Sequence, residues 1–487
     1  FNYDKKDGKR VFLKIGAANY ETRIWINKQY VGRHLGGFTP FMMEVTEYLQ
    51  EENRLLIYVN NTRKKEQIPS LHYDWFNYGG IHRSVELFEL PEAYIKNFKL
   101  NLAKEAGLSK LEYRIELEGK IESKIKITIP ELNINEEVEL DKAESKTQCV
   151  EGFIEIEHVE NLELWSPETP KLYDVHISYK NDVLKEKIGF RIIETSGCDI
   201  LLNGKPIFLK GMCVHEEKSD GGRTLCDDDI VSTLAEAKSL GCNFLRLTHY
   251  PHSEKVAKLA DQLGIMLWEE IPVYWALEFE NKATFEDASN QLKELILRDR
   301  NRASVIIWSI GNENPDSDAR YQFMSSLAEV ARSYDGSRLL GASCLIDVDE
   351  CRIKDRLVDK LDVIGVNEYY GWYLRNFETL EKILTNSEIG KPLIITETGA
   401  DAVPNHFSEA HELYSEEYQA DVYRKQFEVL LKFDYIRGIT PWILYDYASM
   451  RRMSVLQKGY NLKGIISKDR MHKKLAYYVV KDIYKTI

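Results

Sequence analysis

Two glutamates stand at the ends of short apolar segments, and together they could cleave a glycosidic bond. Glu313 follows the run VIIWSIGN in segment 304–315, and Glu397 ends the run PLIITE in segment 391–399. Each run has the Val- and Ile-rich composition of a strand that is buried on both faces. A retaining glycosidase needs an acid/base carboxyl group and a nucleophilic carboxylate about 5–5.5 Å apart. The sequence therefore predicts a sugar-cleaving site between Glu313 and Glu397.

The elements that must position these glutamates alternate between strands and helices from about residue 194 onward. Amphipathic stretches such as 229–241 and 253–264 separate the apolar strands, and each ends on a glycine that stops a helix. The eight strand candidates are IFLKGMCVHE, CNFLRLTHYP, IMLWEEIPVY, VIIWSIGNE, RLLGAS, LDVIGVNEYY, PLIITETG and ITPWILYDY. This order predicts a (β/α)8 barrel over residues 194–487, with the site at the carboxyl ends of its strands.

Two regions of alternating polar and apolar residues precede the barrel. Residues 1–91 contain VFLKIGA, TRIWINKQYVG and NRLLIYVNN, with turn residues at Asn27-Lys28 and Gly36-Gly37, which indicates an antiparallel β-sandwich. Residues 92–193 alternate with period two and carry charges at every second position, as in a second two-sheet sandwich. We interpret this second region as a spacer without catalytic residues.

Composition limits the classes of partner. The 487 residues correspond to two to four domains at about 100–200 residues per domain. A net charge of −13 argues against nucleic acid and anionic membranes as partners. The chain contains no apolar run of the roughly 18 residues that a membrane helix needs. Seven scattered cysteines without a CxxC pair indicate reduced thiols and a cytoplasmic location: Cys149, Cys198, Cys213, Cys226, Cys242, Cys344 and Cys351.

Other catalytic chemistries lack their motifs. The sequence has no GxSxG, no P-loop, no HExxH and no GxGxxG after a strand. A metal site formed by His215, His249 and His252 is a weaker alternative than imidazoles that bind sugar hydroxyls or orient carboxylates. We therefore expect neither a metal nor another cofactor.

Several motifs together carry a family resemblance over essentially the whole chain. VIIWSIGNE, ITETG, HYDWFNYGGIHRSV, NEYYGWY, WSPETP and YSEEYQ resemble glycoside hydrolase family 2, and within it the β-glucuronidases. The resemblance implies a multidomain β plus α/β fold: a jelly-roll β-sandwich (1–91), an immunoglobulin-like β-sandwich (92–193) and a (β/α)8 TIM barrel (194–487). We expect the jelly-roll to be truncated, without its first strands. We also expect a homo-oligomer, either a dimer or a tetramer.

The resemblance also implies roles for individual residues. Glu313 is the acid/base, Glu397 is the nucleophile, and Asn312 reaches the sugar 2-hydroxyl. Asp74 is similar to the family residue that reaches the distal hydroxyls of the sugar. The remaining matches line the same pocket, and they are His215, Tyr369, Tyr373 and Trp442.

Asn461 and Lys463, in GYNLKGI, resemble the Asn-x-Lys pair that grips the C6 carboxylate of a glucuronide. A uronate entering a site with two carboxyl groups must meet a fixed cation and a donor, which these residues could supply. This implies a retaining exo-β-glucuronidase that acts on a small-molecule or oligosaccharide β-glucuronide. A family 2 β-galacturonidase or β-galactosidase is the nearest alternative, and a non-catalytic carbohydrate-binding protein is an alternative of a different class.

Three positions depart from the family pattern. Thr398 follows the nucleophile where the family usually has Tyr, and Asn314 follows the acid/base where the family usually has Pro. Gln457 stands where some β-glucuronidases carry an Arg near the carboxylate, and Lys458 is a possible substitute. The segment PVYWALEFENKATFED is short, which predicts an open mouth with room for bulky aglycones. We expect a changed pocket shape without loss of the reaction.

Overall fold

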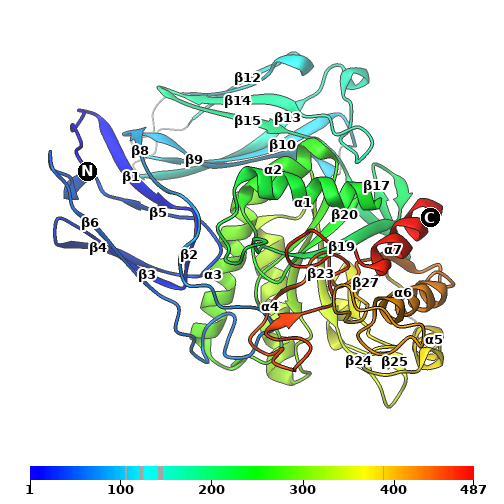
Figure 1. Cartoon of the computed structure of the whole chain (residues 1–487). Coiled ribbons are helices and arrows are strands. Elements are labelled where there is room, and N and C mark those ends of the chain that lie inside the picture. The colour runs from blue at the N-terminus through cyan, green and yellow to red at the C-terminus, as the bar shows by residue number, and fades with distance from the viewer. Residues whose placement is uncertain (105–106, 120–123, 141–145, 388) are drawn as a thin grey trace. The chain divides into compact units, whose positions relative to one another are not determined.

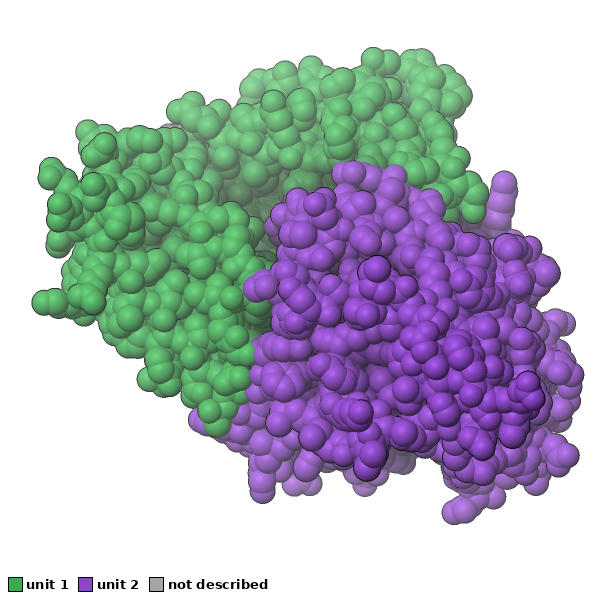
Figure 2. Space-filling view, in the orientation of Figure 1, with its two compact units in different colours: residues 1–62, 79–192, 297–303 green, residues 63–78, 193–296, 304–487 purple. Residues whose placement is uncertain are grey.

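The computed structural model describes residues 1–104, 107–119, 124–140, 146–387 and 389–487. These residues form two compact units, which Figure 2 shows in different colours. The first unit comprises residues 1–62, 79–192 and 297–303, and the second comprises 63–78, 193–296 and 304–487. Both β-sandwiches fall in the first unit, so the domain boundaries expected near residues 91 and 193 stay predictions.

The N-terminal sandwich has two three-stranded antiparallel sheets, in the strand orders β5-β1-β8 and β4-β3-β6. Asn27 and Lys28 form the two-residue turn between β3 and β4 at positive φ, which confirms a hairpin there. Gly36-Gly37 does not form a hairpin, because the chain passes there from β4 in one sheet to β5 in the other. The strands of this sandwich are β1 (Lys9–Ile15), β2 (Ala18–Asn19), β3 (Glu21–Ile26), β4 (Gln29–Leu35), β5 (Phe41–Glu44), β6 (Leu55–Asn60), β7 (Gly80–Ile81) and β8 (Val85–Pro91).

The second sandwich packs a three-stranded sheet, β13-β10-β9, against a four-stranded sheet, β12-β11-β14-β15. Alternate side chains of β10 and β11 enter the core, as the period-two pattern predicts. The strands are β9 (Tyr94–Leu102), β10 (Lys110–Glu118), β11 (Lys124–Ile129), β12 (Ile134–Glu139), β13 (Thr147–Glu155), β14 (Tyr173–Tyr179) and β15 (Asp182–Ile188). The short helices of the first unit are η1 (Thr46–Tyr48), η3 (Pro130–Leu132) and η4 (Val159–Asn161).

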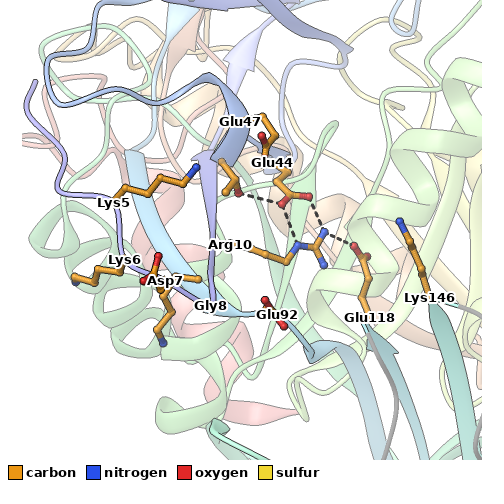
Figure 3. A pocket seen from close by; sticks show the side chains of 13 residues that line it. Lys5, Lys6, Asp7, Gly8, Arg10, Glu44, Glu47, Glu92, Glu118 and Lys146 are labelled. Atoms are coloured by element: carbon orange, nitrogen blue, oxygen red, sulfur yellow. Dashed lines mark hydrogen bonds and ion pairs between the residues drawn. The ribbon is translucent and has the colours of Figure 1, made fainter.

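The first unit also contains an open groove of about 910 Å³, shown in Figure 3. Arg10 lines this groove and donates hydrogen bonds from Nη2 to Glu44 (2.6 Å) and to Glu118 (2.8 Å). Five cationic and five anionic side chains line the groove, so its charges balance: Lys5, Lys6, Lys9, Arg10, Lys146, Asp7, Glu44, Glu47, Glu92 and Glu118. The groove contains neither glutamate of the expected catalytic pair.

The second unit contains a closed barrel of eight parallel strands surrounded by helices (Figure 1). The ring closes where Leu209 of the first strand pairs with Gly438 of the last. The strands are β19 (Leu209–His215), β20 (Phe244–Thr248), β21 (Met266–Glu270), β22 (Val305–Asn312), β23 (Leu339–Cys344), β26 (Val363–Asn367), β27 (Leu393–Glu397) and β28 (Ile436–Ile439). The predicted fold class, β-sandwiches followed by a (β/α)8 barrel, is confirmed.

The helices of the barrel end largely where the sequence predicts. Gly241 and Gly264 stop the first two helices in the left-handed conformation, at φ 101° and 67°. The helices are α1 (Asp227–Leu240), α2 (Glu254–Leu263), α3 (Lys282–Asp299), α4 (Asp318–Tyr334), η5 (Arg356–Asp359), α5 (Phe377–Thr385), α6 (Glu416–Leu430) and α7 (Leu475–Thr486). None of the helices in the described ranges is long and apolar enough to cross a membrane.

The eighth strand differs from its prediction. It covers Ile436–Ile439, whereas the apolar segment ITPWILYDY starts only at Ile439. The strand ends before Pro441, which has no N–H to donate to a ladder, and the following aromatic residues lie beyond the strand. The remaining short strands of this unit are β16 (Ile193–Ser196), β17 (Asp199–Leu202), β18 (Lys205–Ile207), β24 (Ile346–Asp347), β25 (Arg352–Ile353), β29 (Tyr447–Ala448) and β30 (Tyr460–Asn461).

Candidate active site

Glu313 and Glu397 both lie at the carboxyl end of the barrel, as the sequence predicts. Glu397 is the last residue of β27, and Glu313 directly follows β22. Every residue of both strands is buried, so the two backbones hold the side chains at fixed positions. The charge of Glu313 contributes to a raised pKa of Glu397, so the two carboxyl groups interact.

Arg246 of β20 connects the two strand ends from below. It is completely buried and donates from Nη1 to Glu397 Oε1 (2.9 Å) and from Nη2 to Asn312 Oδ1 (2.8 Å). The same Nη2 lies 3.2 Å from the carboxylate of Glu270. A buried arginine needs paired carboxylates, and here it orients the amide of Asn312 and the carboxylate of Glu397 at once.

The protonation of Glu397 reflects opposing influences. Burial raises the pKa of Glu397 to about 7, and the charge of Glu313 acts in the same direction. Arg246 opposes this rise, and so does the hydroxyl of Tyr369, which donates to Glu397 Oε2 at 2.6 Å. The carboxylate is therefore available near neutral pH, and its two oxygens are held by different donors.

Glu313 is half-buried and accepts both of its side-chain hydrogen bonds at one oxygen. The indole N–H of Trp275 donates to Oε2 at 2.9 Å, and Asn312 Nδ2 donates to the same atom at 3.4 Å. Asn312 therefore lies between the two glutamates, since its amide oxygen accepts from Arg246 and its amide nitrogen reaches Glu313.

His249 and Glu270 form a buried polar pair beside Arg246. His249 Nδ1 donates to Glu270 Oε1 at 2.7 Å, and burial lowers the pKa of His249 to about 4. The imidazole is neutral near pH 7, so its 3.7 Å approach to Glu397 is not an ion pair there. Burial likewise lowers the pKa of His215 well below its ordinary value. His252 Nε2 lies 3.0 Å from the carbonyl of Thr248, and the described side chains form no cluster suited to a metal ion.

Packed aromatic side chains, some with polar atoms that have no hydrogen-bond partner, lie at the same end of the barrel as the two glutamates. The ring centroids of His215 lie 5.3 Å from Trp442 and 4.3 Å from Tyr447, and Trp442 stacks on His249. Trp75 packs 6.0 Å from His215. Among the described residues, His215 Nε2, Trp75 Nε1 and the Tyr447 hydroxyl are buried without a hydrogen-bond partner. Buried polar atoms without partners are costly, so a hydroxyl-rich ligand would suit these side chains.

Asp74 belongs to the segment 63–78 of the second unit and joins the mouth through a cluster of polar contacts. Arg452 Nε donates to Asp74 Oδ2 at 3.0 Å, and the hydroxyl of Ser449 donates to Oδ1. Asn461 Nδ2 approaches the same carboxylate at 3.5 Å. The sequence predicted Asp74 and Asn461 for this site but did not predict Arg452.

Lys463 is buried and already paired. Its Nζ donates to Asp401 Oδ2 at 3.1 Å and to the hydroxyl of Tyr373 at 2.9 Å. Both charged side chains are 1% exposed. Burial alone would lower the pKa of Lys463, but Asp401 and Tyr373 hold it above its ordinary value, so the ammonium stays charged. Arg452 Nη1 lies 3.4 Å from the same Tyr373 hydroxyl, which brings a second cation to the Asn461–Lys463 pair.

The structure thus brings all ten predicted site residues to one unit and one end of the barrel. Sequence reasoning missed four residues that hold them there: Arg246, Trp275, Asp401 and Arg452. A lone arginine within the apolar run NFLRLT was a usable signal, because a charge in a buried strand requires a partner. Asp401, four residues after Glu397, gave no comparable signal, since its partner Lys463 lies far along the chain.

Comparisons with known proteins agree with this geometry. The chain matches three models of glycosyl hydrolases family 2: the sugar binding domain over residues 1–91, the central family model over 93–191 and the TIM barrel domain over 193–487. A β-glucuronidase from Paenibacillus borealis is 28% identical over 520 residues, which cover 96% of this chain and 84% of that protein.

Solved structures with a similar fold over nearly the whole chain include two enzymes that act on uronides. A β-galacturonidase from Eisenbergiella tayi, bound to galacturonate, has a TM-score of 0.90 at 27% identity and covers 99% of this chain and 88% of that chain. A β-glucuronidase from Faecalibacterium prausnitzii has a TM-score of 0.85 at 28% identity, with coverage of 99% and 86%.

Proposed function

This chain belongs to glycosyl hydrolase family 2, and from that premise we propose that it is an exo-acting β-glucuronidase that retains anomeric configuration. Glycoside hydrolase activity follows from the family. The choice of a glucuronide rests on one observation, the charged Lys463 ammonium beside Asn461, Tyr373 and Arg452 at the mouth that holds Glu313 and Glu397.

The proposed reaction is a double displacement. The Glu397 carboxylate attacks the anomeric carbon while Glu313 protonates the leaving oxygen, and the bond from that carbon to the aglycone breaks. Glu313 then removes a proton from water as the water oxygen bonds to the anomeric carbon and Glu397 leaves. Arg246 and Tyr369 stabilise Glu397 as a carboxylate, which the first step requires and the second step restores.

The roles of the two glutamates can be tested separately. We expect Glu397→Gln to abolish turnover with every leaving group, because the covalent intermediate can no longer form. We expect Glu313→Ala to retain activity on nitrophenyl glycosides, whose leaving groups need no proton, and to be rescued by azide. An active Glu397→Gln enzyme would overturn the assignment of the nucleophile.

Sugar preference is tested with kcat/KM on the p-nitrophenyl β-D-glucuronide, galacturonide, galactoside and glucoside. Because Lys463 is paired with Asp401, Lys463→Ala alone would leave a buried unpaired carboxylate, so the sharper variant is Lys463→Met with Asp401→Asn. We expect its glucuronide-to-glucoside ratio to fall about tenfold to a hundredfold, the factor of one charge-assisted hydrogen bond. Arg320→Met with Asp355→Asn is the matched control, because it removes another buried pair of a cation and an aspartate (2.6 Å) that lies outside the candidate site.

A β-galacturonidase is the second candidate, and the likeness to the Eisenbergiella tayi enzyme favours it. A wild type that prefers the galacturonide and loses this preference with the Lys463 and Asp401 changes would support it. A wild type that prefers a neutral sugar, with no effect of these changes, would leave family membership intact and refute both uronate proposals.

All seven cysteines are free thiols, which supports a cytoplasmic location. The homo-oligomer stays a prediction.

A further inference from the structure

Trp275 is the one indole that donates to the proposed acid/base in the described part of the chain. Its N–H lies 2.9 Å from Glu313 Oε2, and Asn312 also donates to Oε2. Oε1 receives no hydrogen bond from the described residues. The two oxygens of Glu313 are therefore distinct: one is fixed by the protein and the other is free for the ligand.

The backbone around Trp275 is anchored against the residues that flank Glu313. The backbone N–H of Trp275 donates to the backbone carbonyl of Asn312 at 3.0 Å. Asn314 is 1% exposed, and its side-chain amide donates to the carbonyl of Trp275 (2.8 Å) and to that of Val273 (3.3 Å). Trp275 itself has a φ of 55°, which is unusual for a bulky residue and depends on such anchoring.

Two further contacts restrain the ring itself. The guanidinium of Arg451 lies 4.9 Å from the Trp275 ring centroid, within the range of a cation–π contact. Tyr274 lies 4.6 Å from the same centroid. The indole is thus held from its backbone and from both neighbouring side chains, so its N–H has a fixed direction toward Glu313.

We propose that Trp275 is a positioning residue for the acid/base: it holds Glu313 so that Oε1 faces the leaving oxygen. Asn314 anchors it. This proposal rests on the proposed role of Glu313, but not on which sugar is cleaved. The proton on Oε1 passes to the glycosidic oxygen as the bond to the anomeric carbon breaks. In the second step Oε1 takes a proton from the attacking water.

The chemistry predicts a specific defect. A fixed donor to Oε2 keeps Oε1 within reach of the leaving oxygen, and proton transfer in the transition state depends on that geometry. Removing the donor weakens proton transfer to poor leaving groups and spares leaving groups that depart as anions.

The test compares Trp275→Phe with Trp308→Phe. Trp308 lies on β22, and its indole donates at 2.9 Å to Asp335, a carboxylate outside the candidate site. Both variants therefore lose an indole N–H from a carboxylate, but only Trp275→Phe loses it from Glu313. The measurement is kcat/KM for aryl β-glucuronides of graded leaving-group acidity, with thermal unfolding as a check on folding.

For Trp275→Phe we expect a loss of about tenfold in kcat/KM on the poorest leaving group, as for one hydrogen bond to a charged group. We expect less than about a twofold change on the most activated nitrophenyl substrate. Trp308→Phe should keep the wild-type dependence on the leaving group even where it lowers Tm. Asn314→Ala should lose kcat/KM on the poorest leaving group in the same way as Trp275→Phe.

An unchanged kcat/KM on the poorest leaving group in Trp275→Phe, or equal losses on all leaving groups, would overturn the proposal. A wild-type dependence on the leaving group in Asn314→Ala would refute the anchoring role. If the wild type cleaves another sugar, the same comparison is made on that sugar, so a failed substrate assignment is distinguished from a failed role of Trp275.

Discussion

Removal of the Tyr369 hydroxyl is expected to change the pH range in which the nucleophile works. Glu397 Oε2 accepts from Tyr369 at 2.6 Å, and Oε1 accepts from Arg246 at 2.9 Å. Tyr369→Phe leaves Oε2 without a donor among the described residues while the ring and Arg246 remain. Because burial already raises the pKa of Glu397 to about 7, the loss of a donor to the ionised form must raise it further.

The expected size follows from the energy of the contact. A hydrogen bond to a charged group contributes about 1.5–3 kcal/mol, and one pKa unit corresponds to about 1.36 kcal/mol. The acid limb of kcat/KM should therefore move upward by about one to two pH units. At a pH below this limb, the variant should lose about tenfold to a hundredfold in kcat/KM, whereas the loss should shrink as the pH rises.

The assay is a profile of kcat/KM on p-nitrophenyl β-D-glucuronide from acid to alkaline pH. Tyr370→Phe is the matched control, because Tyr370 is the adjacent buried tyrosine and its hydroxyl makes no hydrogen bond to Glu397. The control should keep the wild-type acid limb. An acid limb that is unchanged in Tyr369→Phe, or that moves to lower pH, would refute the reasoning about Glu397.

Two stability predictions follow from other buried charges. Arg246→Met leaves Glu270 and Glu397 without their shared cation and should destabilise the fold by about 3–5 kcal/mol, seen as a fall in Tm. Arg332→Met, which breaks an exposed pair with Asp362, is the control and should cost at most about 1 kcal/mol, so equal falls would contradict the argument. Burial raises the pKa of Glu368 from 4.5 to about 7, so the folded state keeps this proton up to a higher pH than the unfolded state does. The free energy of unfolding of the wild type therefore falls as the pH rises from 4.5 to 7. Glu368→Gln should have a free energy of unfolding on the order of 3 kcal/mol above that of the wild type at pH above 7, and nearly the same value below pH 4.5, measured by urea unfolding; an equal difference at both pH values would contradict this argument.

The barrel could be predicted because most of its strands and helices have a pattern that is visible within a few neighbouring residues. The strand that precedes Glu313 and the strand that ends in Glu397 are short apolar runs, and α1 and α2 end at glycines, so each could be read from a few neighbouring residues. The eighth strand was predicted a few residues too late in the chain, because the aromatic run after Ile439 has the composition of a strand. Pro441 cannot donate to a strand ladder, so the strand ends before it. The residue at which the last strand pairs with the first depends on the closed barrel and not on local composition.

The contacts that tune the site could not be predicted, because they join residues that are distant in the chain. Arg246 meets Glu397, Asp401 meets Lys463, and Arg452 meets Asp74 only once the barrel is formed. Trp275 and Asn314 lie closer to Glu313 in the sequence, but the direction of the indole depends on backbone angles that residue types do not specify. The catalytic roles of Glu313 and Glu397 stay predictions until the variants are measured.

The closure of the barrel has a consequence for the order in which the protein is made. Leu209 leaves the ribosome long before Gly438, its partner in the ring, and at roughly 5–20 residues per second the first strand waits some tens of seconds. The segment 63–78, which carries Asp74, waits longer, since it emerges with the first sandwich but belongs to the second unit. During synthesis, strands β19 to β27 therefore present apolar faces and an open sheet edge, which is the interval in which a nascent chain would depend on a chaperone.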